Sequence, residues 1–388
     1  MSISERVKTM GESITLAITS NAKKMKQSGE DVIIMASGEP DFDTPDHIKK
    51  AAIEALAKGF TKYTAASGTD ELKSAVCRKL LRDSGLAYKN ENIIITAGGK
   101  QALFNAFLSI INSGDEVVLF SPYWVSYLEQ IRMAGGIPVL ADLEECIANP
   151  EKFASFLTER TKAVLFNSPA NPSGRVIPEE QFRMFVQEAV NRDLFIISDE
   201  VYEKFLYDGN QSVSPASFSE QAKAKTIIIN AFSKTYSMTG WRVGFAAGPK
   251  EVIKAMGAIQ GHQTSNVSSI SQKAALAALE SSQECVTKMV RAFSERREYM
   301  HKRLCAIKGV ICPKPEGAFY LFPDVSQLYK GGIKGSMDFC SRLLEEKKLA
   351  VIPGIGFGAD KHIRFTYSAS MNDIEKGMDR FESFCNSL

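Results

Sequence analysis

Short apolar runs alternate with polar, glycine-containing segments through most of this 388-residue chain. Residues 93–96, 117–120, 163–166, 194–198 and 226–229 are runs of this kind, and their length and flanking turn residues favour buried strands. Residues 91–120 read as strand, glycine turn, helix and strand, which is typical of a βαβ unit. The pattern predicts an α/β fold with ligand groups at the carboxyl ends of its strands.

The two ends of the chain have a different pattern. Residues 1–36 predict an arm with a short amphipathic helix around 21–27. Thr44 and Pro45 predict an N-cap and first turn for a helix over 46–58 that stops at Gly59.

Apolar residues lie on one face of a long helix near residue 290 (Val286, Val290, Phe293, Met300 and Leu304), which marks a domain boundary. The remaining tail predicts a small α+β unit. We therefore expect a large domain of residues 46–280 and a small domain formed by residues 1–45 and 281–388.

Composition excludes several classes of protein. Net charge is only +2, which gives no basic face for nucleic acid or an anionic membrane. No apolar run reaches the roughly 18 residues of a membrane span. Glu5 and Glu12 interrupt the N-terminal segment, which therefore does not read as a secretory signal. The seven cysteines and four histidines are scattered without metal-ligand spacing, so we expect reduced thiols, a cytoplasmic protein and no metal site.

The segment SKTYSMTGWRVG, residues 233–244, follows one predicted strand and carries the main candidate chemistry. At a strand end, Lys234 can project into a crevice and form a Schiff base with an aldehyde cofactor if its pKa is lowered. Arg242 supplies a fixed positive charge for a phosphate. The alternative is that both side chains are merely solvated.

Other predicted strands also end in polar, glycine or aromatic residues. Gly98-Gly99 precedes a helix and can bind phosphate through main-chain amides, or simply form a turn. Trp124 can stack on a heteroaromatic ring or pack in the core. Asn171 lies in a proline-rich turn with its amide free to donate.

Two charged groups stand in predicted strands. Asp199 ends an apolar strand, so its carboxylate needs a partner, either a protonated pyridine nitrogen or a helix N-terminus. Arg364 lies on the opposite strand face from Ile363 and Phe365, where it either clamps a carboxylate or is solvated on an edge strand. Tyr63, in a polar loop, reads equally well as a half-buried aromatic.

Eight motifs occur in one order over nearly the whole chain: SGEPDFDTP, KYTAASG, AGGKQAL, SPYWVSY, NSPANPSG, SDEVYE, SKTYSMTGWRVG and IRFTYS. In this the chain resembles the fold-type I pyridoxal-phosphate aminotransferases, and within them the bacterial-type aspartate aminotransferases of subgroup Ib. The resemblance implies a large domain with a mostly parallel seven-stranded sheet between helices, a smaller α+β domain, and a homodimer.

The resemblance also implies roles for individual residues at the cofactor. Lys234 would hold pyridoxal 5′-phosphate as an aldimine and then shuttle the proton, while Asp199 keeps the pyridine nitrogen protonated. Asn171 and Tyr202 would bind the ring's phenolic oxygen, and Trp124 would stack on the ring. The phosphate would be held by Gly99, Lys100, Ser233, Arg242 and, from the other subunit, Tyr63. Many relatives have a second serine three residues before the lysine, but this chain has Ala231, which removes one hydroxyl.

For the substrate, the resemblance implies that Arg364 and the Gly38 backbone clamp the α-carboxylate, next to Trp124 and Asn171. Lys100 resembles the residue that meets a distal carboxylate, although it could also serve only as positive field at the phosphate. The expected reaction is ping-pong transfer of the amino group of L-aspartate or glutamate to 2-oxoglutarate or oxaloacetate. Prephenate or aromatic amino acid transamination is the alternative, followed by a pyridoxal-phosphate-dependent C–S lyase.

Overall fold

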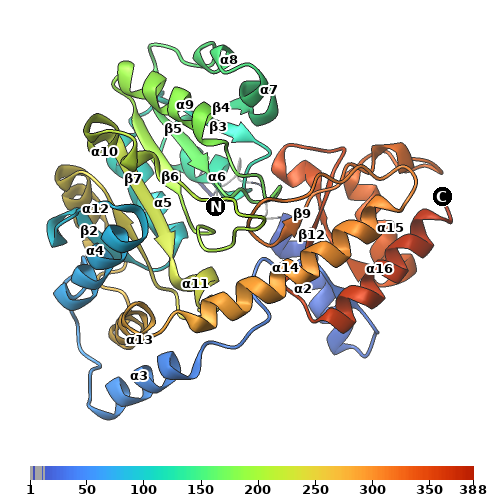
Figure 1. Ribbon diagram of the computed structural model, residues 1–388, viewed down its shortest axis with the longest axis horizontal. Coiled ribbons are helices and arrows are strands. Elements are labelled where there is room, and N and C mark those ends of the chain that lie inside the picture. The colour runs from blue at the N-terminus through green and yellow to red at the C-terminus, as the bar shows by residue number, and fades with distance from the viewer. Residues whose placement is uncertain (1–2, 5–10, 12–13) are drawn as a thin grey trace.

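The computed structural model of the chain describes residues 3–4, 11 and 14–388 and arranges most of them around one large sheet (Figure 1). Glu5 and Glu12, whose charges argue against a secretory signal, lie outside the described residues. On one side of the molecule lies the large sheet with its helices. On the other side, the C-terminal segment in orange and red packs beside the blue N-terminal segment (Figure 1).

The large sheet has seven strands in the order β2-β8-β7-β6-β5-β3-β4. Only β8 is antiparallel to its neighbours, so the predicted mostly parallel seven-stranded sheet is confirmed. The predicted βαβ unit is only partly right, because β8, β7, β6 and β5 separate its two strands β2 and β3. The strands are β2 (Ile93–Thr96), β3 (Glu116–Ser121), β4 (Ile137–Asp142), β5 (Thr161–Asn167), β6 (Phe195–Asp199), β7 (Thr226–Ala231) and β8 (Gly244–Ala247).

Helices cover both faces of this sheet because most of its strands are apolar at successive positions. Ile93 and Ile95 of β2 pack into one core with α4 and α13, whereas Ile94 packs into the opposite core with α5 and α12. Side chains alternate between the faces of a strand, so a continuous apolar run buries both faces. The covering helices are α4 (Asp70–Ser84), α5 (Gly99–Ile110), α6 (Ser126–Met133), α7 (Leu143–Ala148), α8 (Glu151–Ala154), α9 (Glu179–Asn191), α10 (Glu220–Lys225), α12 (Lys250–Gln263) and α13 (Ser269–Glu280), and α3 (Asp46–Ala57) packs on α13.

A smaller α+β unit joins the two ends of the chain. Strand β1 of the N-terminal segment pairs with β10, and β9, β11 and β12 form a separate antiparallel sheet in the order β11-β12-β9. The strands are β1 (Ile33–Ile34), β9 (Tyr320–Leu321), β10 (Leu349–Ala350), β11 (Ile352–Pro353) and β12 (Ile363–Thr366), and the helices are α2 (Ile14–Gln27), α14 (Glu284–Cys305), α15 (Ser336–Lys347) and α16 (Met371–Cys385).

Helix α14 connects the two units, and its apolar face changes core along its length. Val286 packs with the large-sheet core, while Phe293, Met300 and Leu304 pack with the small unit. The single predicted face of a long helix is therefore confirmed. The exact domain limits of 46–280, 1–45 and 281–388 stay a prediction.

Two local predictions are corrected near the N-terminus. Helix α2 is longer than predicted, since its described part runs from Ile14. Thr44 is not the N-cap of α3, because Pro45 takes that position and makes no side-chain cap. The Thr44 hydroxyl instead donates to the carbonyl of Ser237, a tertiary contact that local pattern cannot anticipate. Gly59 follows α3 in the left-handed region, at φ 72°, as its stop role requires.

Among the described helices, none is both long and apolar enough to cross a membrane. Residues 3–4, 11 and 14–388 contain no group of three or more His, Cys, Asp or Glu side chains placed to hold a metal ion. All seven cysteines are free thiols.

Candidate active site

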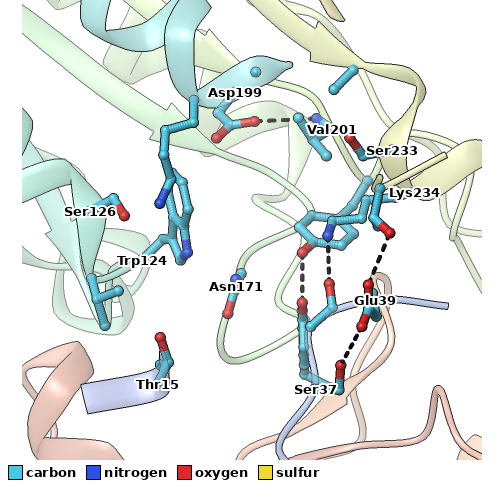
Figure 2. A pocket seen from close by; sticks show the side chains of 18 of the residues that line it. Thr15, Ser37, Glu39, Trp124, Ser126, Asn171, Asp199, Val201, Ser233 and Lys234 are labelled. Carbon is cyan, nitrogen blue, oxygen red and sulfur yellow. Dashed lines mark hydrogen bonds between the residues drawn. The ribbon is translucent and has the colours of Figure 1, made fainter. Parts of the chain in front are cut away.

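The carboxyl ends of β5, β6 and β7 open onto a cavity of about 420 Å³ at the boundary with the small unit. In Figure 2 the side chains of Lys234 and Trp124 lie on opposite sides of this cavity, with Asp199 above and between them in the view. Parallel strands end at the same sheet edge, so residues far apart in sequence meet there. The predicted site residues that line it are Gly38, Gly99, Lys100, Trp124, Asn171, Asp199, Tyr202, Ser233, Lys234, Arg242 and Arg364.

Lys234 lies just beyond β7, in the short helix α11 (Phe232–Thr235). Its amine donates a hydrogen bond to the main-chain carbonyl of Gly38, which belongs to the N-terminal segment. Burial lowers its pKa to about 8, with the cations Arg364 and Arg242 acting in the same direction and Glu39 opposing them. An amine with this pKa is partly neutral at neutral pH, which a nucleophile requires.

Asp199 ends β6 and is buried, at 6% exposed. Its carboxylate accepts one hydrogen bond from the Tyr127 hydroxyl at 2.7 Å and one from the Val201 amide at 3.3 Å. Burial raises the pKa of Asp199 to about 6, and these hydrogen bonds limit the rise. No described helix begins directly after β6, so the helix-cap alternative is wrong.

Tyr127 was missed as a site residue although it belongs to the motif SPYWVSY. It lies in the first turn of α6, three residues after Trp124, and the two rings meet edge to face at 5.3 Å. A tyrosine one helical turn after a candidate ring-stacking tryptophan gave a weak signal. Only the tertiary structure shows that its hydroxyl reaches Asp199.

The cavity wall beside Trp124 carries hydrogen-bonding groups of both units. Tyr202, in the turn after β6, shares a hydrogen bond of 2.7 Å with the hydroxyl of Tyr320 from β9. The side-chain oxygen Oδ1 of Asn171 accepts a hydrogen bond from Arg364 at 2.9 Å, which leaves the side-chain NH₂ of Asn171 as a donor. Trp124 is half-buried: it packs against a hydrophobic core cluster and also lines the cavity. Tyr320 was also missed, because EGAFYLF reads as an ordinary apolar strand.

Another part of the cavity wall, at the start of α5, is built mainly from backbone and suits an anion. Helix α5 begins at Gly99, and Gly98 before it has φ 80°. A Cβ on Gly98 would lie 2.8 Å from Nη2 of Arg242, so only glycine lets the guanidinium approach this helix terminus. Main-chain amides, the helix dipole and Arg242 all favour a bound anion here. Ser233 lines the same cavity. Ala231 lines it too, and it offers a methyl group in place of a serine hydroxyl.

Arg364 stands at the small-unit end of the cavity in the central strand β12, and it is 3% exposed. Its guanidinium donates to Asn171 and to the Ala36 carbonyl, both at 2.9 Å, while its buried Nε has no partner in the described part of the chain. Ile363 and Phe365 pack into the core, as alternation predicts. The edge-strand alternative is therefore wrong.

Lys100 and Tyr63 occupy different places relative to the cavity. The Lys100 ammonium lies 4.9 Å from the Trp124 ring centre, and its pKa is lowered by burial and by Arg242. Tyr63 does not line the cavity of its own chain and is 91% exposed, so the half-buried reading is wrong. The arm helix α2 was not predicted at the site, yet its residues Thr19 and Lys23 line the cavity.

Comparison with known proteins places this geometry in a family. The aspartate aminotransferase of Geobacillus stearothermophilus is 44% identical over 388 residues, covering 99% of both chains. The aspartate/prephenate aminotransferase of Cereibacter sphaeroides is 41% identical over 396 residues, covering 100% of this chain and 99% of its own. The structure of aspartate aminotransferase from Thermus thermophilus with maleate superposes with a TM-score of 0.93 at 41% identity, covering 99% of both chains. The model of the class I and II aminotransferases matches residues 30–381, and the chain belongs to this family.

Proposed function

We propose that this protein transfers the amino group of L-aspartate or L-glutamate to 2-oxoglutarate or oxaloacetate, with pyridoxal 5′-phosphate as cofactor. The observation that carries the proposal is the meeting of Lys234, Asp199 and Arg364 in one cavity. An amine of lowered pKa, a buried carboxylate and a buried guanidinium are together suited to bind a carbonyl, a cationic ring and a carboxylate.

The residues present fit pyridoxal phosphate at each of its polar groups. Gly98 leaves room for Arg242 at the N-terminus of α5, which suits a phosphate dianion. Asp199 suits a protonated ring nitrogen, because a buried carboxylate gains most from a cationic partner. Lys234 suits the aldehyde carbon and Trp124 the ring face. When bound, this cofactor acts as an electron sink that makes the Cα proton of an amino acid removable.

The chain's own groups then bind the substrate and move its proton. Arg364 lines the cavity and orients the amino acid by donating to its α-carboxylate. The Lys234 amine, with a pKa of about 8, is the base that takes the Cα proton. Tyr202 and Asn171 would hydrogen-bond the phenolic oxygen of the cofactor ring. Because both half-reactions use one cavity, the first oxo acid leaves before the second enters.

The dicarboxylate preference rests on Lys100 and on the relatives. Lys100 is an ammonium with no ion pair to a described residue, above Trp124 and within the field of Arg242. Maleate, named with the Thermus structure, is itself a dicarboxylate. Prephenate also carries a second carboxylate, and two relatives are named for it, so it is the second acceptor to test.

A homodimer in which Tyr63 enters the neighbouring site completes the proposal. Tyr63 is 91% exposed, and Ile53 and Leu56 of α3 nearby in sequence are also exposed, at 65% and 57%. Such apolar side chains favour a covered surface. Light scattering should give the mass of a dimer. Mixing inactive Lys234→Ala and weakened Tyr63→Ala subunits should restore activity in mixed dimers, whereas a tyrosine acting in its own chain gives no gain.

We also propose a cytoplasmic location, since all seven thiols are unpaired.

The decisive experiment exposes the purified yellow protein to single amino acids and follows its visible absorbance. Aspartate and glutamate should bleach the band, and 2-oxoglutarate or oxaloacetate should restore it. Bleaching by other amino acids alone would contradict the dicarboxylate preference. Release of pyruvate and ammonia from a sulfur amino acid without any oxo acid would indicate a C–S lyase instead.

A further inference from the structure

The loop of residues 37–45 is fastened to the segment 234–242 that carries the catalytic lysine. The Gly38 carbonyl accepts from the Lys234 amine, and Glu39 accepts from the Thr239 hydroxyl at 2.9 Å. Figure 2 shows Glu39 beside Lys234, with Ser37 on its other side. Two segments about 200 residues apart are thus held together at the cavity.

Thr44 makes the most buried of these contacts, at 8% exposed. Its hydroxyl donates to the Ser237 carbonyl at 2.6 Å and accepts from the Trp241 indole nitrogen at 2.9 Å. Ser237 lies three residues after Lys234, and Trp241 directly precedes Arg242. A single hydroxyl therefore ties both ends of the loop that separates Lys234 from Arg242.

This loop has a backbone that needs such support. Ser237 and Arg242 both lie in the left-handed region, at φ 50° and 53°, which non-glycine residues rarely adopt. Conformations of this kind persist where the surroundings fix them. The Arg242 side chain runs from this strained position to the carbonyls of Thr239 and Ala97, beside Gly98. Its direction at the anion site therefore depends on how the loop is held.

We propose that Thr44 is a positioning residue whose hydroxyl sets the Arg242 guanidinium at the Gly98-Gly99 anion site. Thr44 thereby governs how tightly the protein holds the phosphate group of its cofactor. The inference rests on the proposed function for the identity of that anion. It assigns Thr44 no contact with substrate or cofactor.

The test compares the affinity of the apoenzyme for pyridoxal phosphate and for pyridoxal, which lacks the phosphate, by absorbance titration. Thr44→Val keeps the shape and removes the hydroxyl. It should weaken the binding of pyridoxal phosphate about tenfold and change the binding of pyridoxal less than about twofold, as expected when the buried hydrogen bonds of one hydroxyl are lost. Thr44→Ser should restore the wild-type ratio of the two affinities. Trp241→Phe, which removes the indole donor, should reproduce the selective loss and decides the matter if Thr44→Val does not fold.

Thr226→Val is the matched control. Thr226 is buried, and its hydroxyl donates to the Ala222 carbonyl at the far end of β7. This variant should lower thermal stability without changing the ratio of the two affinities. Equal losses for both ligands in Thr44→Val, or no loss for either, would overturn the inference. Wild-type protein that binds neither ligand would instead overturn the proposed function.

Discussion

The two ends of the cavity are built to hold anions in opposite ways. The end at α5 uses main-chain amides, two glycines and Arg242, whose side chain is exposed. The end at β12 uses Arg364, which is 3% exposed and forms no ion pair with any described residue. Its two hydrogen bonds to described residues go to neutral acceptors, the Asn171 side chain and the Ala36 carbonyl.

This difference indicates how much each end of the cavity gains in free energy when an anion binds there. A helix terminus is partly solvated without ligand, so an anion there adds a moderate stabilisation. A buried guanidinium without a counter-ion is costly, and burial lowers the pKa of Arg364. A carboxylate that reaches Arg364 relieves this cost. Substrate recognition should therefore be more sensitive to substitution than phosphate binding.

The largest expected effect comes from Lys234, whose removal should abolish catalysis without weakening anion binding. Lys234→Ala should lower kcat by roughly four orders of magnitude or more, because it removes both the covalent attachment and the base. Affinity for inorganic phosphate, measured by calorimetry on the apoenzyme, should change little. Borohydride treatment of the wild type followed by peptide mapping should label Lys234, and a label on another side chain would contradict its role.

Arg364→Leu should have the next largest effect and should act only at the substrate end. We expect kcat/KM for aspartate to fall about 10²–10³-fold, because a buried charged partner of the carboxylate is lost. Pyridoxal phosphate affinity should stay within about twofold. Arg364→Lys serves as the control that keeps the charge. A loss of cofactor affinity as large as the loss of kcat/KM would show that the two ends are not independent.

Lys100→Ser tests which end this lysine serves. If it meets the distal carboxylate, kcat/KM for aspartate should fall about tenfold or more relative to that for alanine, since one exposed charge pair is lost. Steady-state kinetics with both amino acids measures the ratio. Equal losses for both, together with weaker pyridoxal phosphate binding, would assign Lys100 to the phosphate end.

Tyr127→Phe tests the carboxylate that lies between the two ends. The Tyr127 hydrogen bond lowers the pKa of Asp199, which burial raises to about 6, so its removal should raise that pKa further. Asp199 stabilises a ring cation only when ionised, that is above its pKa. The acid limb of the kcat/KM profile should therefore move to higher pH and cost a few-fold in activity near pH 6. If the acid limb does not move, the Tyr127 hydrogen bond does not control the pKa of Asp199.

Glu39→Gln should give the smallest effect. Glu39 raises the pKa of Lys234, so removing its charge should lower that pKa below about 8. Capture of pyridoxal phosphate by the apoenzyme needs the neutral amine and rises with pH through this pKa. Stopped-flow measurement should place the midpoint at lower pH in the variant than in the wild type, and a midpoint at higher pH would contradict the assignment.

Much of the site was predictable because its residues follow strands. Asp199, Lys234 and Gly98 each stand directly after an apolar run, and parallel strands bring such positions to one edge. Tyr127 and Tyr320 were missed because each acts through a contact between segments remote in sequence, with Asp199 and Tyr202. The role of Thr44 was assigned wrongly for the same reason. A local cap signal could not show that its hydroxyl turns to Ser237.

The sequence by itself determined the α/β class, the strand-end placement of Lys234 and Asp199 and the ordered motifs of the family, because these follow from short-range periodicity and spacing. Only the tertiary structure decided that four strands separate β2 from β3, that Arg364 is buried with no counter-ion among the described residues and that Tyr63 does not line the cavity of its own chain. Burial, and the electrostatics that follow from it, depend on which remote segments pack together, and a local pattern does not contain that information.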